Sequence, residues 1–250
     1  MKKVFHNKYE SDKLKIDGFI ESFENSGASI KDSRNKLKLF DLGSEVVNIK
    51  SFKVPNLINQ IIYKYFRKGK AQRSFEYANT LLEMGIGTPM PIAYYEFSTS
   101  LLFKKSFYIS AQLECDLTYR ELIRDLNFPN HEQILREFTQ FTFQLHEKGI
   151  HFLDHSPGNT LIKSNGNHYE FYLVDLNRMK FGAMSLKTRI ENFARLTKEK
   201  MLVEIMSDEY AKCAGKDYDT VFKLMWQSVE DFQQTKQRKK RLKKLFKFTK

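Results

Sequence analysis

Three polar side chains whose types and spacing suit phosphoryl transfer lie in the second half of the chain. Asp154 and Asn159 are five positions apart within the stretch DHSPGN, and Asp175 directly follows the apolar residues Leu173 and Val174. In such an arrangement the first Asp accepts the proton of the attacking hydroxyl, while the Asn and the second Asp bind Mg²⁺. Amide and carboxylate oxygens are ligands that Mg²⁺ prefers. The pattern therefore predicts a metal-dependent phosphotransferase, although Asp154 and Asn159 alone would also suit a simple capped turn.

A lysine and a glutamate in the first half of the chain fit the same chemistry. Lys50 ends the stretch VNIK, which agrees with the V-A-I-K pattern at three of four positions and closes a predicted strand. An ammonium group there would bind the α- and β-phosphates of ATP. Glu76 lies on the next predicted helix and could form an ion pair with Lys50. Lys53 is the alternative lysine, but on a continuing strand it would face the opposite side of the sheet, so we favour Lys50.

The nucleotide itself would be bound by two further segments. The chain contains no G-x-G-x-x-G loop, and Gly27 in the stretch NSGAS is the best candidate for a close approach of the backbone to phosphate. Gln112, Glu114 and Cys115 follow a predicted strand at the expected hinge between lobes, where backbone groups would bind adenine. Cys115 would be a packing residue there. The alternative for this hinge segment is an edge strand that leads into a loop.

The elements that must position these residues follow a defined order along the chain. Strands are predicted at 18–23, 35–40, 45–52, 92–97 and 106–113, with a helix beginning at 57 and a second at 70–84. From 117 onward the chain is mainly helical, including a helix at 132–148. This order predicts an α+β fold with two lobes of protein-kinase type. The expected parts are an N-lobe with an antiparallel sheet and a helix (1–115), a mainly helical C-lobe (116–235) and a basic tail (236–250).

The composition excludes several other classes of protein. Hydrophobic residues make up 41% of the 250 positions and charged residues 29%, as in ordinary globular proteins. No run of eighteen apolar residues predicts a membrane span, and no apolar segment follows the first lysines to form a secretory signal. Cys115 and Cys213 form no CxxC pair, so no disulfide or zinc site is expected and a reducing cytoplasm fits best.

The positive charge is concentrated at the C-terminus. The net charge is +12, and residues 236–250 contain nine Lys or Arg and no acidic residue, which leaves 12 − 9 = +3 for the rest of the chain. Leu242, Leu245 and Phe246 have the i, i+3, i+4 spacing of one helix face. A basic amphipathic helix of this kind suits an anionic membrane surface. The alternatives are a solvated tail and, ranked lower, binding to the phosphates of nucleic acid.

Several short segments make the chain resemble the Kdo/lipopolysaccharide kinase family over about residues 18–200. These segments are RN (34–35), KSF (50–52), RSFE (73–76), GIGTP (85–89), LTYREL (117–122), GIH (149–151), VDLNR (174–178) and NFARL (192–196). No single one of them is decisive, and the resemblance rests on their number and order.

The resemblance implies a protein-kinase-like fold, ATP and Mg²⁺ as cofactors, and the phosphorylation of Kdo or heptose in the lipopolysaccharide inner core. The acceptor would be a sugar or glycolipid at the cytoplasmic face of the inner membrane, where the chain would be peripheral. By position, Lys50 would bind phosphate, Glu76 would orient Lys50, and Asp154 would be the base. Asn159 and Asp175 would bind the metal.

The chain departs from the family pattern in places that keep alternatives open. Phe152 stands where a His usually precedes the catalytic Asp, and His151 lies one position earlier; it would equally suit a packed core histidine. The triplet Asp175-Leu176-Asn177 replaces D-F-G, and no A-P-E follows, which favours a small or glycolipid acceptor over a protein. The alternative functions are a small-molecule kinase of aminoglycoside or choline type, and a pseudokinase that binds nucleotide or membrane without catalysis.

Overall fold

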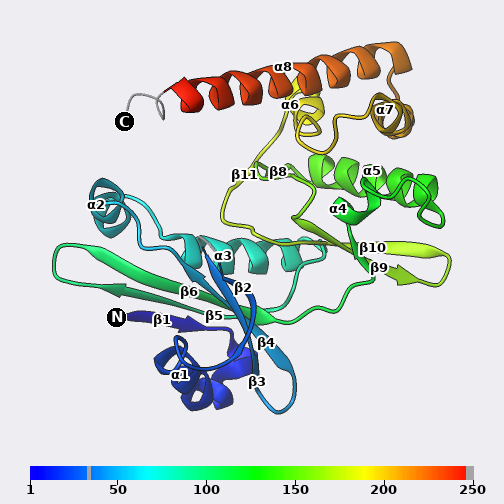
Figure 1. Cartoon of the computed structure of the whole chain (residues 1–250). Coiled ribbons are helices and arrows are strands. Elements are labelled where there is room, and N and C mark those ends of the chain that lie inside the picture. Colours follow the sequence, from blue (N-terminus) through cyan, green and yellow to red (C-terminus); the bar gives the residue numbers. More distant parts are fainter. Residues whose placement is uncertain (33–34, 246–250) are drawn as a thin grey trace. The chain divides into compact units, whose positions relative to one another are not determined.

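The computed structural model describes residues 1–32 and 35–245 of the chain (Figure 1). The chain divides into two compact units. The first unit consists of Met1–Glu114 together with the short segment Leu173–Asn177. The second consists of Cys115–Tyr172 and Arg178–Lys250. Each unit has secondary structure of a different kind, in agreement with the predicted α+β class.

The first unit is built on a six-stranded sheet in which every paired strand is antiparallel to its neighbour. The spatial order is β1-β5-β6-β4-β3-β2, so β4, which carries Lys50, is an interior strand between β3 and β6. The strands are β1 Lys2–Phe5, β2 Ala28–Asp32, β3 Lys36–Asp41, β4 Val46–Phe52, β5 Pro91–Ser98 and β6 Phe103–Ala111.

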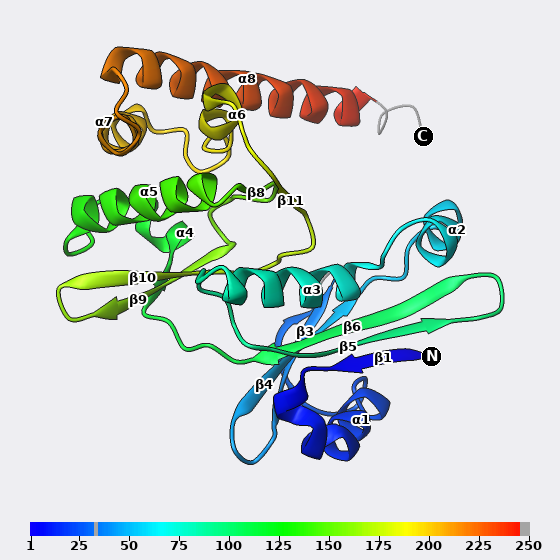
Figure 2. The same ribbon diagram turned by 180° about the vertical axis from the view of Figure 1, so that it is seen from behind.

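Helices cover both faces of this sheet (Figures 1 and 2). On one face lie the short helix η1 (Asn7–Asp12) and α1 (Lys13–Glu21), whose apolar residues join Val47 and Ile49 in one core. On the other face lies α3 (Lys70–Glu83), whose Phe75 packs with Phe52 of β4. Because side chains alternate along a strand, Lys50 shares the α3 face with Phe52. Helix α2 (Leu57–Tyr65) connects β4 to α3.

The predicted strand at 18–23 is wrong, because most of this segment belongs to α1. The apolar residues of α1 are spaced for a helix: Ile16 and Ile20 are four positions apart and both are buried against the sheet. Phe23 follows the helix and is 1% exposed. The short apolar run would suit a strand by its local composition. In the structure it packs on a face of the sheet as a helix and does not pair with an edge strand.

The second unit consists mainly of helices and two small sheets. The helices are α4 (Tyr119–Leu122), α5 (His131–Glu147), α6 (Leu186–Glu191), α7 (Lys200–Ala214) and α8 (Tyr218–Leu245). One sheet has the order β10-β9-β7, and the other pairs β11 with β8. The strands are β7 Leu117–Thr118, β8 Ile150–Phe152, β9 Thr160–Asn165, β10 His168–Leu173 and β11 Met179–Phe181.

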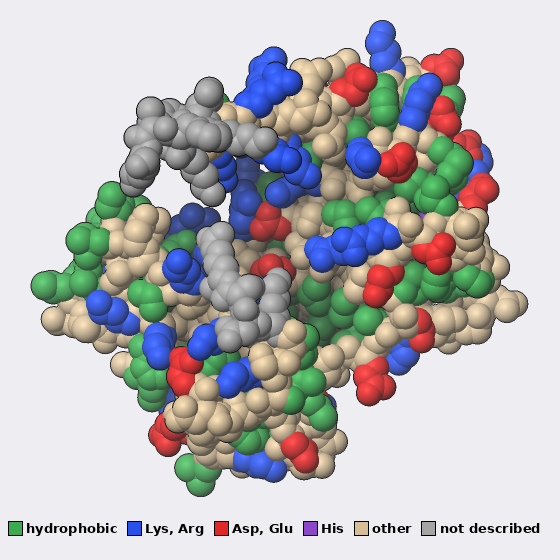
Figure 3. All heavy atoms as spheres, in the orientation of Figure 1, with side chains coloured by type: hydrophobic (Ala, Val, Ile, Leu, Met, Phe, Trp, Pro, Cys, Tyr) green, Lys and Arg blue, Asp and Glu red, His purple; other side chains and the backbone are tan. Residues whose placement is uncertain are grey.

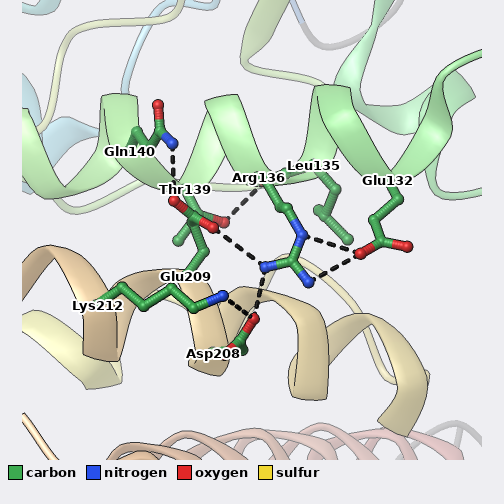
Figure 4. A network of polar contacts seen from close by, with 8 residues as sticks. All are labelled: Glu132, Leu135, Arg136, Thr139, Gln140, Asp208, Glu209 and Lys212. Carbon is green, nitrogen blue, oxygen red and sulfur yellow. Dashed lines mark hydrogen bonds and ion pairs between the residues drawn. The ribbon is translucent and has the colours of Figure 1, made fainter.

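A polar network joins α5 to α7 (Figure 4). The guanidinium group of Arg136 on α5 lies 2.6 Å from Asp208 and 3.1 Å from Glu209 on α7, and it also pairs with Glu132. Gln140 donates to Glu209 at 2.7 Å. The hydrogen bond to Asp208, above all, raises the pKa of Arg136. The network fixes the register of the two helices, and α5 leads directly into β8 and the loop that carries Asp154.

The C-terminal segment continues helix α8 as far as Leu245. Leu242 is exposed, while the side chain of Leu245 and the whole of Phe246 lie outside the described residues. The predicted apolar face of the tail is therefore described only at Leu242. Among the residues that the structure describes, none of the helices combines the length and the apolar composition needed to cross a bilayer.

Candidate functional site

Lys50 and Asp175 form an ion pair in the first unit. Lys50 lies on β4 between Leu37 of β3 and Tyr108 of β6, and its ammonium nitrogen is 2.8 Å from Oδ1 of Asp175. The Lys50 side chain is 17% exposed, and the ammonium group also lies 5.4 Å from the centre of the Phe52 ring. Two predicted site residues that are 125 positions apart are thus brought together.

Local contacts explain why Asp175 reaches Lys50. Leu173 donates its backbone N–H to Gly87 at 2.9 Å, and the Thr88 hydroxyl donates to the Leu173 carbonyl at 2.8 Å. These bonds attach the segment Leu173–Asn177 to the connection between α3 and β5. Asp175 adopts a left-handed backbone conformation, with φ 62°, which Asp tolerates better than most residues. The amide of Asn177 donates to Asp175 Oδ1 at 2.6 Å, so the unusual third residue of the triplet supports the first.

The expected ion pair between Lys50 and Glu76 is not formed. Glu76 pairs instead with Lys68 at 2.9 Å and accepts a hydrogen bond from Gln72 at 2.8 Å. Burial opposes ionisation of Glu76, but the bonds from Lys68 and Gln72 outweigh it and lower the pKa of Glu76. Gln72 lies one helical turn before Glu76, within hydrogen-bond reach of its carboxylate. Lys50 pairs with Asp175 instead of Glu76.

Lys53, the alternative lysine, lies beyond the end of β4. Its side chain is exposed, and its backbone N–H donates to Asn35 Oδ1 at 3.2 Å. The contact between Lys50 and Asp175 therefore favours Lys50 for the phosphate-binding role.

Asp154 and Asn159 lie on one loop of the second unit. The loop begins after β8, and Leu153 donates its N–H to the Arg178 carbonyl at 3.1 Å, next to the pairing of β8 with β11. The side-chain amide of Asn159 donates to the Asp154 carbonyl at 2.8 Å, and the Asn159 N–H donates to the Ser156 carbonyl at 2.9 Å. The spacing of five residues thus produces a closed loop in which Asn159 holds the backbone of Asp154.

Two arginines hold the carboxylate of Asp154. Nη1 of Arg178 lies 2.9 Å, and Nη1 of Arg195 3.1 Å, from the same Asp154 oxygen, Oδ1. Arg195 also donates to the Leu153 carbonyl at 3.0 Å, and its guanidinium group lies 5.7 Å from the ring centre of Phe232 on α8. Neither arginine was among the site residues predicted from the sequence. The available signal was that both lie in family-like segments, VDLNR and NFARL.

A third guanidinium group, that of Arg120, lies against the same loop at Gly158. An added Cβ at Gly158 would overlap the Arg120 guanidinium group. The loop of Asp154 therefore has three arginines in contact with it.

Two buried histidines, His146 and His155, help to hold the loop of Asp154 in place. The ring of His155 is fully buried and stacks on Phe138, with centroids 5.4 Å apart, and burial lowers its pKa to about 3. Burial also lowers the pKa of His146 to about 4. His146 contacts Asn192 Oδ1 at 3.2 Å, and Asn192 donates to the Phe152 carbonyl at 2.9 Å. Both rings are neutral at pH 7 and hold the start of the loop by packing and hydrogen bonds.

His151, which was expected either near the base or as a packed residue, is part of β8 and half-buried. Burial, and then the charge of Lys180 on the paired strand β11, lower the pKa of His151. Its described contacts are those of a strand residue, and Arg178 and Arg195 take the places beside Asp154.

The predicted hinge residues follow β6 where the chain passes from one unit to the other. The division falls between Glu114 and Cys115. Gln112 donates its backbone N–H to the Val46 carbonyl at 2.8 Å and accepts from the Asn48 amide at 2.9 Å. Burial raises the pKa of the Cys115 thiol, and nearby Glu121 and Asp116 add to the effect. Cys115 is therefore not an activated nucleophile.

Gly27 has a packing role. It directly precedes β2, at the end away from the 33–35 connection to β3, and its φ is 82°. An added Cβ would lie 2.6 Å from the Phe40 ring, so Gly27 permits the contact of β2 with β3. The expected approach of Gly27 to phosphate has no support from this position. Residues 33 and 34 of the connection, including Arg34 of a family-like segment, lie outside the described residues.

Two comparisons with known proteins give the family and the fold of the chain. A profile described as "Lipopolysaccharide kinase (Kdo/WaaP) family" matches residues 54–223, more than half of the chain. A solved structure described as "WaaP in complex with acyl carrier protein" contains a chain of similar fold, with a TM-score of 0.61 and 14% sequence identity. The alignment covers 92% of this chain and 99% of that chain. No curated protein sequence matches.

The profile match includes Glu76, Asp154, Asn159 and Asp175 and begins four residues after Lys50. The likeness to the solved structure covers 92% of the chain and so extends beyond the residues that the profile matches. On these grounds the chain is a kinase and belongs to the lipopolysaccharide kinase (Kdo/WaaP) family.

Proposed function

We propose that this kinase transfers the γ-phosphoryl group of ATP to a hydroxyl of Kdo or heptose in the lipopolysaccharide inner core. The observation that carries the proposal is the presence, in the order expected of a kinase, of the Lys50–Asp175 pair and the Asp154–Asn159 loop. Lys50 would bind the α- and β-phosphates, and Asp154 would accept the proton of the sugar hydroxyl. Backbone groups of Glu114 and Cys115 would bind adenine, since the N–H of Gln112 is donated to Val46.

Glu76 retains a role in this proposal once nucleotide is bound. It lies on α3, the helix that covers the Lys50 face of the sheet. Phosphate would draw the Lys50 ammonium group away from Asp175, and we expect Glu76 to orient it then, after release from Lys68.

The donor set fits Mg²⁺. Asp175 offers a carboxylate and Asn159 an amide oxygen, while Mg²⁺ typically takes one or two protein ligands and completes its shell with phosphate and water. In the described part of the chain, no three His, Cys, Asp or Glu side chains form a cluster. A Mg²⁺ site with one or two protein ligands does not need such a cluster. When bound, the ion would neutralise charge on the transferred phosphoryl group. We propose that Asp175 and Asn159 hold it.

The charge around Asp154 favours an acidic acceptor over a cationic one. Arg178 and Arg195 contact the Asp154 carboxylate, and Arg120 lies against Gly158 of the same loop. Three guanidinium groups and one carboxylate leave surplus positive charge, which attracts anions and repels cations. Kdo is a carboxylic acid, whereas aminoglycosides and choline are cations. The small-molecule kinase alternative is therefore disfavoured.

The support that Asn177 gives to Asp175 bears on the pseudokinase alternative. The D-L-N triplet and the absence of a glycine-rich loop are the sequence features that favour a pseudokinase. Asn177 donates directly to the Asp175 carboxylate, and that carboxylate pairs with Lys50. A triplet that positions its Asp in this way favours a working kinase.

We further propose that the enzyme is peripheral at the cytoplasmic face of the inner membrane, where its glycolipid acceptor is made. The basic end of α8 would contribute by attraction to anionic lipid. The similar solved structure is named as a complex with acyl carrier protein, and an acidic carrier protein is a further partner that we propose for this chain.

The test compares the wild-type enzyme with Asp154→Asn on purified lipid A–core acceptor, with ATP and Mg²⁺. We expect the substitution to lower kcat by about 10²- to 10⁴-fold while ATP affinity changes little, because a base acts mainly in the transition state. Asp219→Asn, an exposed carboxylate on α8, is the matched control. Mass spectrometry of the product identifies the sugar. Equal turnover by Asp154→Asn would refute the assignment of the base, and turnover on choline or an aminoglycoside alone would refute the acceptor class.

A further inference from the structure

Helix α2 presents its apolar side to solvent. The side chains of Leu57 and Ile58 are 60% and 70% exposed, and Phe66, directly after the helix, is 81% exposed. Ile61 and Tyr65 are also exposed, and the spacing i, i+1, i+4, i+8 from Leu57 places these four helix residues on one side. No residue of α2 is buried. The apolar side of this helix therefore does not serve the core of its own unit.

The opposite side of α2 holds the helix in place. The Tyr63 ring lies 5.7 Å from the Phe103 ring and 6.0 Å from the Arg73 guanidinium carbon. Gln60 donates to the Pro55 carbonyl at 2.9 Å, and Asn56 caps the first turn by accepting from the Asn59 N–H at 3.0 Å. These contacts fix the rotation of the helix about its axis, so the apolar side faces outward as a structural feature of this unit.

The connection between β5 and β6 extends this apolar surface. Leu101 lies in that connection and is 66% exposed. The Tyr65 hydroxyl donates to the Ser100 carbonyl at 3.4 Å, which links α2 to the connection. In Figure 3, green side chains gather at the left edge, over α2 and the tip of the β5–β6 hairpin. We call Leu57, Ile58, Ile61, Tyr65, Phe66 and Leu101 the α2 surface. An exposed apolar surface of this kind marks a binding site.

The stretch of sequence that contains α2 carries only positive charges. No Asp or Glu occurs between Glu45 and Glu76, whereas this stretch contains seven basic residues. Lys53 and Arg67 are exposed and Lys64 is half-buried. A cleft of about 400 Å³ beside α2 is lined by Lys53 and Lys70 together with Asn56 and Asn59, among other residues. This cleft lies on the Tyr63 side of the helix. Lys64 and Arg67, which adjoin Tyr65 and Phe66 in sequence, provide donors for phosphate beside the exposed apolar side chains.

We propose that the α2 surface docks the kinase on an anionic phospholipid bilayer. The apolar side chains would enter the boundary between headgroups and acyl chains, while the cations bind headgroup phosphates. Tyr65 and Phe66 are aromatic side chains of the kind that lie at this boundary. A bilayer suits a projecting apolar helix because lipids adapt to its shape, whereas a protein partner would need a complementary groove. The proposal concerns a surface other than the basic tail, and it is tested without nucleotide or acceptor.

The experiment measures co-sedimentation of the full-length protein with phosphatidylcholine vesicles that contain phosphatidylglycerol. We expect Ile58→Asp and Phe66→Asp each to weaken vesicle binding by more than about tenfold, since each removes buried apolar area and adds a repelled charge. Leu14→Asp is the matched control, because Leu14 is 88% exposed on α1 of the same unit, and it should bind like wild type. All these side chains are exposed, so the variants should keep the wild-type melting temperature.

Charge and insertion are separated by two further variants. Arg67→Gln should weaken binding to the anionic vesicles by about fivefold, and this difference should shrink as salt rises. The Trp fluorescence of Phe66→Trp should be quenched by brominated lipid more strongly than that of wild type, whose one Trp is Trp226. The double variant Lys239→Glu/Lys240→Glu tests the tail in the same assay and should retain the sensitivity to Ile58→Asp.

Vesicle binding by Ile58→Asp and Phe66→Asp equal to that of wild type would overturn the proposal. Loss of binding in the tail variant together with no effect of the α2 variants would assign the membrane contact to α8. Binding of an acidic carrier protein that is lost in Ile58→Asp, with vesicle binding intact, would instead make a protein the occupant of the α2 surface.

Discussion

At the scale of single residues, the chemistry of the two units differs in how each key carboxylate is held. Asp175 is bound by one flexible ammonium group and one amide, those of Lys50 and Asn177. Asp154 is bound at one oxygen by the guanidinium groups of Arg178 and Arg195. Arginine keeps its charge and presents donors in a rigid fork. We therefore expect Asp154 to keep its orientation before the acceptor binds, whereas Asp175 can exchange its ammonium partner for a metal ion.

The substitution Asp175→Asn tests this difference. We expect the affinity for Mg·ATP to fall by at least about tenfold, because a charged metal ligand is replaced by a neutral one. In the presence of a chelator, ATP should bind as well as or better than to wild type, because the substitution releases Lys50 and removes a negative charge. Isothermal titration calorimetry with and without Mg²⁺ measures both effects. Glu83→Gln, at the exposed end of α3 in the same unit, is the control. An unchanged dependence on Mg²⁺ would place the metal elsewhere.

At the scale of elements, the register of α5 and α7 depends on one arginine with three acidic partners. Arg136 contacts Glu132 on its own helix and Asp208 and Glu209 on α7 (Figure 4). Glu209 is 9% exposed. Without Arg136, the carboxylate of Glu209 would lose its cation and keep only the neutral donor Gln140, next to the negative charge of Asp208. The network therefore lies on the helix that precedes β8 and the loop of Asp154.

We predict that Arg136→Ala lowers the free energy of unfolding by about 1–3 kcal/mol, since it leaves a nearly buried carboxylate without its cation. Lys212→Ala, which removes only the exposed partner of Asp208, should change it by less than about 1 kcal/mol. Urea denaturation followed by circular dichroism measures both values. Equal effects of the two substitutions would show that the network is a surface charge cluster without a structural role.

At the scale of the whole molecule, buried neutral histidines make stability depend on pH. Burial holds the pKa of His155 at about 3 and that of His146 at about 4, below the unfolded value of 6.5. Below about pH 6.5 the unfolded chain binds protons at these positions and the folded chain does not, so stability is full above that pH and falls with acidification. Each histidine should remove about 2 kcal/mol between pH 7.5 and pH 5.

The variant His155→Phe should show a smaller fall in melting temperature over that pH range. The phenyl ring can keep the stack on Phe138, and it removes the buried Nδ1 atom, which has no hydrogen-bond partner among the described residues. His168→Gln, at an exposed position, should follow wild type. Differential scanning calorimetry across the pH range measures this, and an identical pH dependence in wild type and His155→Phe would show that His155 is not buried in the neutral form.

Features that depend on short stretches of chain could be predicted from the sequence alone. Asp154 and Asn159 share a loop because five residues can close one, and Asn159 bonds back to Asp154 at 2.8 Å. The apolar run before Lys50 determined β4, and regular apolar spacing determined α3 and α5. The order of these elements was sufficient to predict an α+β fold of kinase type, and the family match agrees with it.

The partners of these residues depend on contacts between segments that are distant in sequence. Lys50 had Glu76 as its expected partner, but bonds between Leu173 and the Gly87–Thr88 connection bring Asp175 to it instead. The segment at 18–23 is apolar enough for a strand, but burial on the face of the sheet, together with the helical spacing of Ile16 and Ile20, makes most of it part of α1.

Contacts between distant segments also determine the position of the two arginines and the orientation of α2. The sequence predicted a helix beginning at residue 57, but the contact of Tyr63 with Phe103 determines that the apolar side of α2 faces outward. Arg178 and Arg195 reach Asp154 from positions 24 and 41 residues away in sequence. Local patterns specify secondary structure through backbone geometry and burial, whereas ion-pair partners and outward faces depend on contacts between distant segments, which no local pattern contains.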